Sequence, residues 1–210
     1  METRTRILET ALRLFLVQGY ENTSMRQVAE SLGISKPAIY HYFKGKEDLA
    51  LQVVGLFEER TRKWVTDKSC DVRDFGSFMR FKFEAIPVFS HVEVVVLGED
   101  AHDDSYRHGF NDLISSLAGI NPDVRKRVAA IFEHARGNIQ RQALSALEAG
   151  HIRDDVDTEA LAFMVHAIIE GMGVLGHFDP GIDEADISRR MFQMFMKMIN
   201  YKGPSASREE

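Results

Sequence analysis

The chain has 210 residues, of which 44% are apolar and 28% are charged, a balance that is ordinary for a globular protein with a sizeable core. Its net charge of −6 excludes a protein that nucleic acid coats over its whole surface. Cys70 is the single cysteine, which excludes an internal disulfide. There is no apolar run of the roughly 18 residues that a membrane span needs and no apolar leader after Met1. The sequence therefore predicts a cytoplasmic protein without membrane contact.

Charge is distributed unevenly along the chain. Residues 1–63 carry a net charge of +2, and the remaining residues carry a net charge of −8. Within residues 22–46, Glu30 is the one acid beside four basic residues, which are Arg26, Lys36, Lys44 and Lys46. The sequence thus predicts a small cationic patch on an acidic protein, although charge alone does not separate it from a chance fluctuation.

Helical periodicity runs through most of the chain. Apolar residues recur on one helical face from Ile7 to Phe15, and Gly19 ends that helix. Five further helices are predicted over residues 46–65, 74–86, 124–150, 158–176 and 184–200. Residues 92–97 have the β-branched composition of a strand, but we assign them to a helix because every neighbour is helical. With two short helices within residues 24–43, the predicted fold class is all-α with about nine helices.

The pattern within residues 23–48 is the most informative. Ser24 and Gln27 match a capping box, which starts a helix, and Gly33 ends it because glycine adopts a left-handed conformation at low cost. Ser35 is suited to cap the next helix, and Pro37 falls in its first turn, where the missing N–H costs nothing. Two short helices joined by a tight turn match the helix-turn-helix that docks on DNA.

The second helix of this pair has two different faces. Ile39 and Phe43, four residues apart, are predicted to anchor it in the core, while the opposite face presents basic, small and aromatic groups without an acid. Such a face suits the DNA major groove, and the lysines that follow it suit phosphate contacts. The predicted DNA contacts are Thr23, Ser24, Arg26, Ser35, Lys36, Pro37, Ala38, Tyr40, Tyr42, Lys44 and Lys46.

Several short motifs occur together in this stretch, namely Ala11-x-x-Leu14-Phe15, Gly19-Tyr20, Thr23-Ser24-Met25-Arg26, Val28-Ala29, Leu32-Gly33-Ile34-Ser35 and the run from Tyr40 to Leu49. In this combination, residues 7–46 resemble the DNA-binding domain of the tetracycline-repressor (TetR) family. The resemblance implies an Ω-shaped homodimer of helical subunits that binds a palindromic operator, usually as a repressor, and that a ligand releases. It implies a DNA-binding domain over residues 1–48, a helical effector-binding and dimerisation domain over 49–202, and a disordered tail over 203–210.

The region between the motif and the last two helices is rich in phenylalanine and is interrupted at Pro87 and near Pro122. Phenylalanines are more often core than ligand contacts, yet an all-α domain this rich in them can enclose an apolar cavity. We expect an apolar or amphipathic small molecule as the effector, and no cofactor. The residues predicted to contact it are Phe78, Phe83, Phe110, Phe132 and His166.

The last two helices are apolar over most of their circumference, so each must bury two sides. A two-fold homodimer through a four-helix bundle would bury the second side, whereas a wholly internal core is the alternative. Glycines at positions 171, 173 and 176 would let a partner helix approach closely. The predicted interface residues are Met164, Ile168, Met172, Met191, Met194 and Met198.

Three other functions compete with a ligand-responsive repressor. A DNA-architectural protein without an effector would bind DNA with low sequence preference. An activator, or a regulator without an effector, has the same sequence signature. A carboxylate-bridged metal enzyme would need two Glu-x-x-His pairs on separate helices. Glu99 and His102 match that spacing, as do Glu148 and His151, but Gly150 is predicted to end the helix before His151. We therefore predict neither a metal site nor an enzymatic activity.

Overall fold

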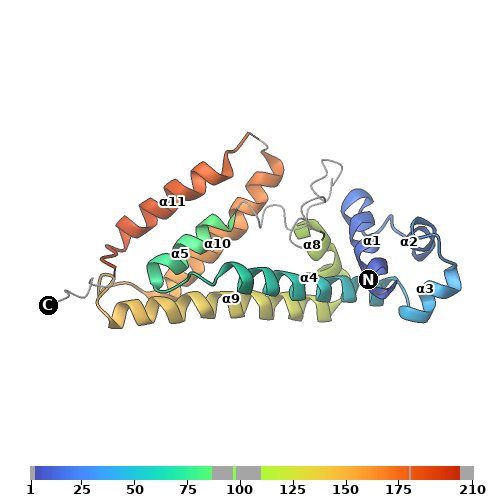
Figure 1. Cartoon of the computed structure of the whole chain (residues 1–210), viewed down its shortest axis with the longest axis horizontal. Coiled ribbons are helices and arrows are strands. Elements are labelled where there is room, and N and C mark those ends of the chain that lie inside the picture. Colours follow the sequence, from blue (N-terminus) through green and yellow to red (C-terminus); the bar gives the residue numbers. More distant parts are fainter. Residues whose placement is uncertain (1–2, 87–96, 98–109, 180, 204–210) are drawn as a thin grey trace. The chain divides into compact units, whose positions relative to one another are not determined.

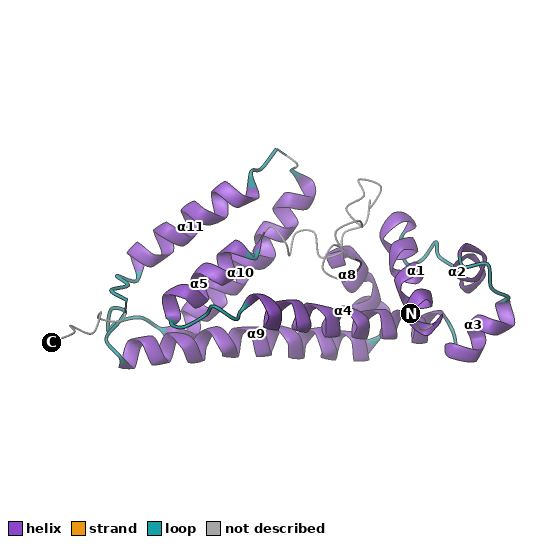
Figure 2. Ribbon diagram, in the orientation of Figure 1, coloured by secondary structure: helices purple, strands orange, loops and turns teal. Residues whose placement is uncertain are grey.

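The computed structural model of the protein describes residues 3–86, 97, 110–179 and 181–203, with the side chains of residues 110, 111 and 177 excepted. Every regular element in this part of the chain is a helix (Figures 1 and 2). In chain order the helices are α1 (Thr3–Gln18), α2 (Met25–Ser31), α3 (Lys36–Tyr42), α4 (Lys46–Lys68), α5 (Phe75–Glu84), α8 (Phe110–Ile120), α9 (Pro122–Glu148), α10 (Thr158–Phe178) and α11 (Glu184–Met198).

The predicted all-α fold class is confirmed. Helices α1–α5 and α9–α11 coincide with the helices that the periodicity indicates. Helix α8 was not predicted as a separate element, because Asn111, Asp112 and the two serines that follow dilute its apolar pattern. Its Leu113 and Leu117, one turn apart, are nevertheless buried. The helix predicted over residues 92–97 lies outside the described residues, except for Leu97 at its end.

The described residues form two compact units. The first combines residues 3–64 with 97 and 110–129, and the second combines residues 65–86 with 130–179 and 181–203. The DNA-binding domain predicted for residues 1–48 lies within the first unit, which extends beyond it.

The core of the first unit is built around the apolar face of α1. Ile7, Leu12 and Phe15 are completely buried there, together with side chains from α2, α3, α4 and α8. An ion pair between Arg60 of α4 and Glu9 of α1 crosses the edge of this core. The three N-terminal helices are therefore held by the first turns of α4 and by α8, and not by one another alone.

The core of the second unit is formed by α5, α9, α10 and α11. Its aromatic centre is Phe83 of α5, whose ring centroid lies 6.0 Å from that of Phe192 and 5.6 Å from that of Phe195 on α11. Contrary to the expectation from apolar run length, residues Thr158–Gly176 of α10 are long and apolar enough to cross a membrane. One side of that helix packs in this core, through Leu161, Val165 and Met172 among others.

Gly76, in the first turn of α5, lies directly against Tyr201 beyond α11. The backbone N–H of Gly76 donates to the Tyr201 hydroxyl at 3.1 Å. A Cβ atom at Gly76 would stand 2.6 Å from the Tyr201 ring, which is closer than real Cβ contacts come. The absence of a side chain at residue 76 is therefore what lets the C-terminal residues close over the start of α5.

Gly76→Ala should lower the free energy of unfolding by about 1–3 kcal/mol, because the overlap outweighs the better helix propensity of alanine. Urea unfolding followed by circular dichroism measures the change. Gly137→Ala inside α9 is the matched control, since its methyl would meet only the flexible end of Arg141, at 3.4 Å. Equal stability losses in both variants would contradict the packing role of Gly76.

Candidate functional site

Helix α2 begins with the capping box that the sequence predicts. The backbone N–H of Gln27 donates to the Ser24 hydroxyl oxygen at 3.2 Å, and the backbone N–H of Ser24 donates to Gln27 Oε1 at 2.8 Å. The two residues thereby satisfy two backbone donors that an open helix end leaves without partners.

The turn between α2 and α3 follows the same local rules. Gly33 has a φ of +66°, so the left-handed conformation that stops α2 falls on a glycine as predicted. Ser35 caps α3 by accepting a hydrogen bond from the backbone N–H of Ala38 at 3.3 Å, and Pro37 occupies the first turn. These contacts fix where α3 starts and in which direction it leaves the turn.

Helix α3 is attached to the core by one side only. Ile39 and Phe43 are 0% and 1% exposed, whereas Tyr40 and Tyr42 are 45% and 37% exposed. Lys36 is exposed as well, and its ammonium lies 5.9 Å from the centre of the Tyr40 ring. The face opposite the anchors is therefore free to meet DNA, and it carries a cation and two phenol hydroxyls.

The loop from α3 to α4 is fixed by Asp48. Its carboxylate accepts hydrogen bonds from the backbone N–H of Lys44 at 2.7 Å and from Gln52 Nε2 at 2.8 Å. Burial alone would raise the pKa of this carboxyl, but these hydrogen bonds and the charges of Lys44 and Arg4 hold it below its usual value. Asp48 thus stays ionised and keeps Lys44 at a defined place beside the end of α3. The sequence did not predict this role for Asp48, because its partner atoms come together only once the loop has formed.

Most of the predicted DNA contacts lie at the surface around α2 and α3. Exposed residues include Ser24, Ser35 and Pro37, while Ala38 is partly buried. Arg26 is exposed too, although it forms an ion pair with Glu30 at 2.6 Å. A contact from Arg26 to DNA would have to compete with that neighbour on the same helix.

Thr23 does not fit the prediction. Its side chain is 2% exposed, and its hydroxyl donates to the Gly19 carbonyl at 2.9 Å and accepts from Gln18 Nε2 at 3.1 Å. The hydroxyl is therefore used inside the turn between α1 and α2 and is not available to DNA.

Lys46 also differs from the simple phosphate contact that we predicted. Its ammonium donates to the Glu21 carbonyl at 3.1 Å and lies 4.1 Å from the centre of the Tyr20 ring. Burial lowers the pKa of this ammonium below its usual value, although the charge of Glu21 acts in the opposite sense. Lys46 thus ties the first residue of α4 to the turn between α1 and α2.

The predicted effector contacts fall into two groups within the second unit. The rings of Phe132 on α9 and His166 on α10 meet edge to face, with centroids 4.9 Å apart, and His166 Nε2 lies 3.2 Å from a carboxylate oxygen of Glu170. Phe78 and Phe83 belong to the α5 side of the core. Phe83 lines a groove of about 700 Å³ between α5 and α11, which Phe78, Phe132 and His166 do not line. The side chain of Phe110 lies outside the described residues.

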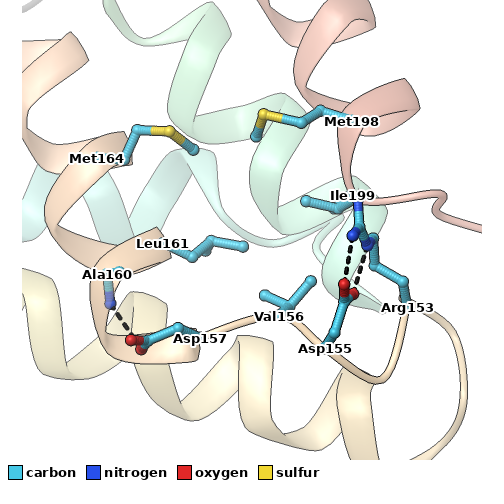
Figure 3. Close-up of a pocket in the computed structure, with 9 residues that line it drawn as sticks. All are labelled: Arg153, Asp155, Val156, Asp157, Ala160, Leu161, Met164, Met198 and Ile199. Carbon is cyan, nitrogen blue, oxygen red and sulfur yellow. Dashed lines mark hydrogen bonds and ion pairs between the residues drawn. The ribbon is translucent and has the colours of Figure 1, made fainter.

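A pocket of about 270 Å³ separates the start of α10 from the end of α11 (Figure 3). Met164 and Met198, two of the predicted interface residues, extend toward each other across it. An ion pair between Arg153 and Asp155 borders the pocket, and the Asp157 carboxylate accepts the backbone N–H of Ala160 at 3.0 Å. The pocket thus lies on the surface that the sequence assigns to the dimer.

The predicted interface stripe on α10 proves to face the core of its own subunit. Met172 is 6% exposed and packs within the second unit, which corrects its assignment to the interface, and Met164, Ile168 and Met191 are partly buried. The side that α10 and α11 leave open carries large apolar residues, of which Met194 and Met198 belong to the predicted interface. Between 44% and 75% of each is exposed, and they are Phe163, Val174, Leu175, Phe178, Met194 and Met198.

The predicted end of the helix before His151 is confirmed. Helix α9 ends at Glu148, and Gly150 has a φ of +68°, so His151 lies beyond the helical turn that would align it with Glu148. Glu99 and His102 lie outside the described residues. In the part of the chain that the structure covers, no three His, Cys, Asp or Glu side chains gather where they could hold a metal ion.

Two family models match this chain. The model for bacterial regulatory proteins of the tetR family matches residues 7–53, and the model for the tetracyclin repressor-like C-terminal domain matches residues 111–198. A helix-turn-helix at the start of an all-helical chain defines a DNA-binding regulator. With both models in sequence order over more than half of its length, the chain belongs to the tetR family.

Individual relatives support the same assignment. The HTH-type transcriptional regulator AcrR of Shigella flexneri is 46% identical over 57 residues, which are 27% of this chain and 26% of AcrR. The HTH-type transcriptional repressor KstR2 of Rhodococcus jostii is 26% identical over 165 residues, 76% of this chain and 72% of KstR2. The matches to the first five curated relatives span 19% to 39% of those proteins.

Solved structures show the same fold. A candidate transcriptional regulator from Saccharomonospora viridis, crystallised in complex with choline, has a TM-score of 0.68 at 22% identity. The likeness covers 92% of this chain and 95% of that one. The resemblance therefore extends over the C-terminal helices as well as over the helix-turn-helix.

Lys46→Met should lower the free energy of unfolding by about 1 kcal/mol, because it removes a hydrogen bond and a cation–π contact that join α4 to the α1–α2 turn. Urea unfolding of the full chain measures the loss. Lys44→Met is the matched control, since the Lys44 side chain is exposed and its loop contact is made by the backbone. Should both variants unfold at the same urea concentration, Lys46 does not act as this tie.

Proposed function

We propose that this protein is a transcriptional repressor that binds a palindromic operator as a homodimer and dissociates when a small molecule binds its C-terminal helices. The observation that carries the proposal is the exposed, acid-free face of α3. Lys36, Tyr40 and Tyr42 stand on a helix whose opposite side is fully buried, so the face has a fixed orientation. We further propose that the protein acts in the cytoplasm, by binding and not by catalysis.

Dimerisation follows from the apolar surface of α10 and α11. Large apolar side chains that are 44% to 75% exposed on two consecutive helices are costly in a monomer and typical of an interface. Gly171 lies on the open side of α10, where a Cβ atom would meet nothing within 4 Å, so a partner helix can approach the backbone there. Two such helices from each subunit would form a four-helix bundle.

Release by a ligand requires that the ligand bind the DNA-incompetent state more tightly than the DNA-bound state. The two recognition helices of a dimer must sit one helical turn of DNA apart, or a multiple of it, so a small change in their separation weakens both contacts. We place the ligand near Phe132 and His166, because a partly buried aromatic ring beside a buried imidazole suits an amphipathic molecule. The choline complex of the Saccharomonospora viridis protein supports small-molecule binding by this fold.

Lys36→Ala and Tyr42→Phe should each weaken operator binding about tenfold while leaving the helical spectrum unchanged, because each removes a polar contact from the α3 face. Lys44→Ala should weaken binding to all DNA sequences equally and lower the salt slope by about one, as loss of a phosphate contact does. Fluorescence anisotropy with operator and random DNA over a salt series measures both effects.

Lys63→Ala on α4, another exposed lysine, serves as the control for these three variants. The operator itself is obtained by selecting bound fragments from a genomic library. Unchanged operator affinity in all three variants would remove α3 from the DNA interface and overturn the proposed function.

Leu175→Glu and Met194→Glu should each weaken the dimer about a hundredfold or more, because an unpaired charge would be buried in an apolar interface. Sedimentation velocity over a concentration series measures the change. Ile120→Glu, at an exposed apolar residue at the end of α8, should leave the dimer intact. A stable wild-type monomer at micromolar concentration, or a dimer unaffected by both substitutions, would rule out this interface.

A further inference from the structure

Lys82 occupies a position on α5 that the helical pattern reserves for the core. It belongs to the stripe Phe75, Phe78, Met79, Lys82, Phe83 and Ile86, which recurs at the spacing of one helical face. The five other members of this stripe are at most 6% exposed. Lys82 therefore places an amine in a stripe whose other members are all buried apolar side chains.

The surroundings of Lys82 leave its ammonium poorly compensated. Its Nζ lies 5.4 Å from the centre of the Phe78 ring and 6.0 Å from that of Phe81. The described residues provide it with no carboxylate within ion-pair distance, whereas Arg60, Arg127 and Arg153 each meet one. Burial lowers the pKa of the Lys82 ammonium below its usual value. Two ring faces offset part of this cost, but an ammonium has three N–H donors that rings satisfy weakly.

A lysine in such a place costs stability, since Lys82 is partly buried and methionine would fill the same space without a charge that has to be desolvated. A charged side chain that lowers the stability of the free protein can contribute favourably once a ligand of opposite charge binds to it. Among the described residues the Lys82 ammonium lacks an anionic partner, and the groups recorded beside it are the rings of Phe78 and Phe81. His166, a buried titratable side chain of this unit, differs because a carboxylate oxygen of Glu170 already lies 3.2 Å from its Nε2.

We propose that Lys82 binds the anionic head group of an amphipathic effector, a carboxylate attached to an apolar chain or ring. The inference rests on the proposed function, because it assigns the charge of the effector. It places the anionic head group at α5 and not beside Phe132 and His166. The ammonium forms a charge-assisted hydrogen bond to the carboxylate, and the phenylalanines of α5 contact the adjoining apolar part. A cationic amphiphile is disfavoured at the same place by like charge.

Three probes with the same alkyl chain test the proposal: decanoate, decanol and decyltrimethylammonium. Calorimetric titration of the full-length wild type should give at least about tenfold tighter binding of decanoate than of decanol, with the cation weakest. Lys82→Met should remove the advantage of decanoate and leave the affinity for decanol unchanged. Lys82→Arg should keep the advantage, because it keeps the charge.

A second readout moves in the opposite direction. Without any probe, Lys82→Met should raise the melting temperature by about 2–4 °C, because it removes a partly buried charge that only two aromatic rings offset. Lys68→Met, at an exposed lysine at the end of α4, should change neither the melting temperature nor the preference for decanoate. A wild type that does not prefer decanoate, or a Lys82→Met variant that still does, would overturn the proposal.

Operator binding in the presence of decanoate separates this inference from the proposed function. Coupling between two sites is reciprocal, so decanoate should weaken operator binding by the factor by which operator weakens decanoate binding. If decanoate binds through Lys82 but leaves operator affinity unchanged, the anion site stands and release by this ligand is wrong. If operator affinity falls equally in wild type and in Lys82→Met, the release does not act through Lys82.

Discussion

The burial of Ile39 and Phe43 is the constraint on which the proposed DNA-binding surface depends. Helix α3 has seven residues, too few for a helix to be stable in water by itself. These two side chains join it to a core supplied by α1, α2 and α4, and protein cores are packed densely enough to set the position of what they hold. Every exposed group on the other face of α3 therefore inherits its position from two residues that never meet DNA. A loss of volume at either anchor would move the whole face.

Local structure around α3 could be predicted from the sequence because its causes are local. The caps at Ser24 and Ser35 and the left-handed Gly33 each involve residues no more than four positions apart. Lys46 could not be placed in the same way, since its partner Glu21 lies 25 positions earlier and the contact exists only after α1, α2 and α4 have packed. The sequence predicts a DNA contact for Lys44 and for Lys46 alike. It does not reveal that the Lys46 ammonium already donates to a carbonyl of its own chain.

The orientation of α10 shows a second limit of sequence patterns. The helix is apolar around most of its circumference, so its sequence allows more than one stripe to face inward. The structure selects the stripe of Leu161, Val165 and Met172, which packs with α5, α9 and α11. The stripe of Phe163, Val174 and Phe178, displaced around the helix, is left outside. Periodicity predicts that α10 has apolar sides to bury. Which of those sides faces the core depends on the shapes of the neighbouring helices.

The first unit is discontinuous in the sequence, and this has a consequence for how the protein is made. Leu113, Leu117 and Val124 are buried in the same core as α1 and α4. A ribosome that has released only residues 1–68 has produced α1 to α4 without this part of their core. The nascent chain must therefore keep an apolar surface uncovered until residue 124 of 210 has emerged. Chaperone capture during synthesis would be strongest in that interval, and a regulator able to hold DNA would arise only after more than half of the chain exists.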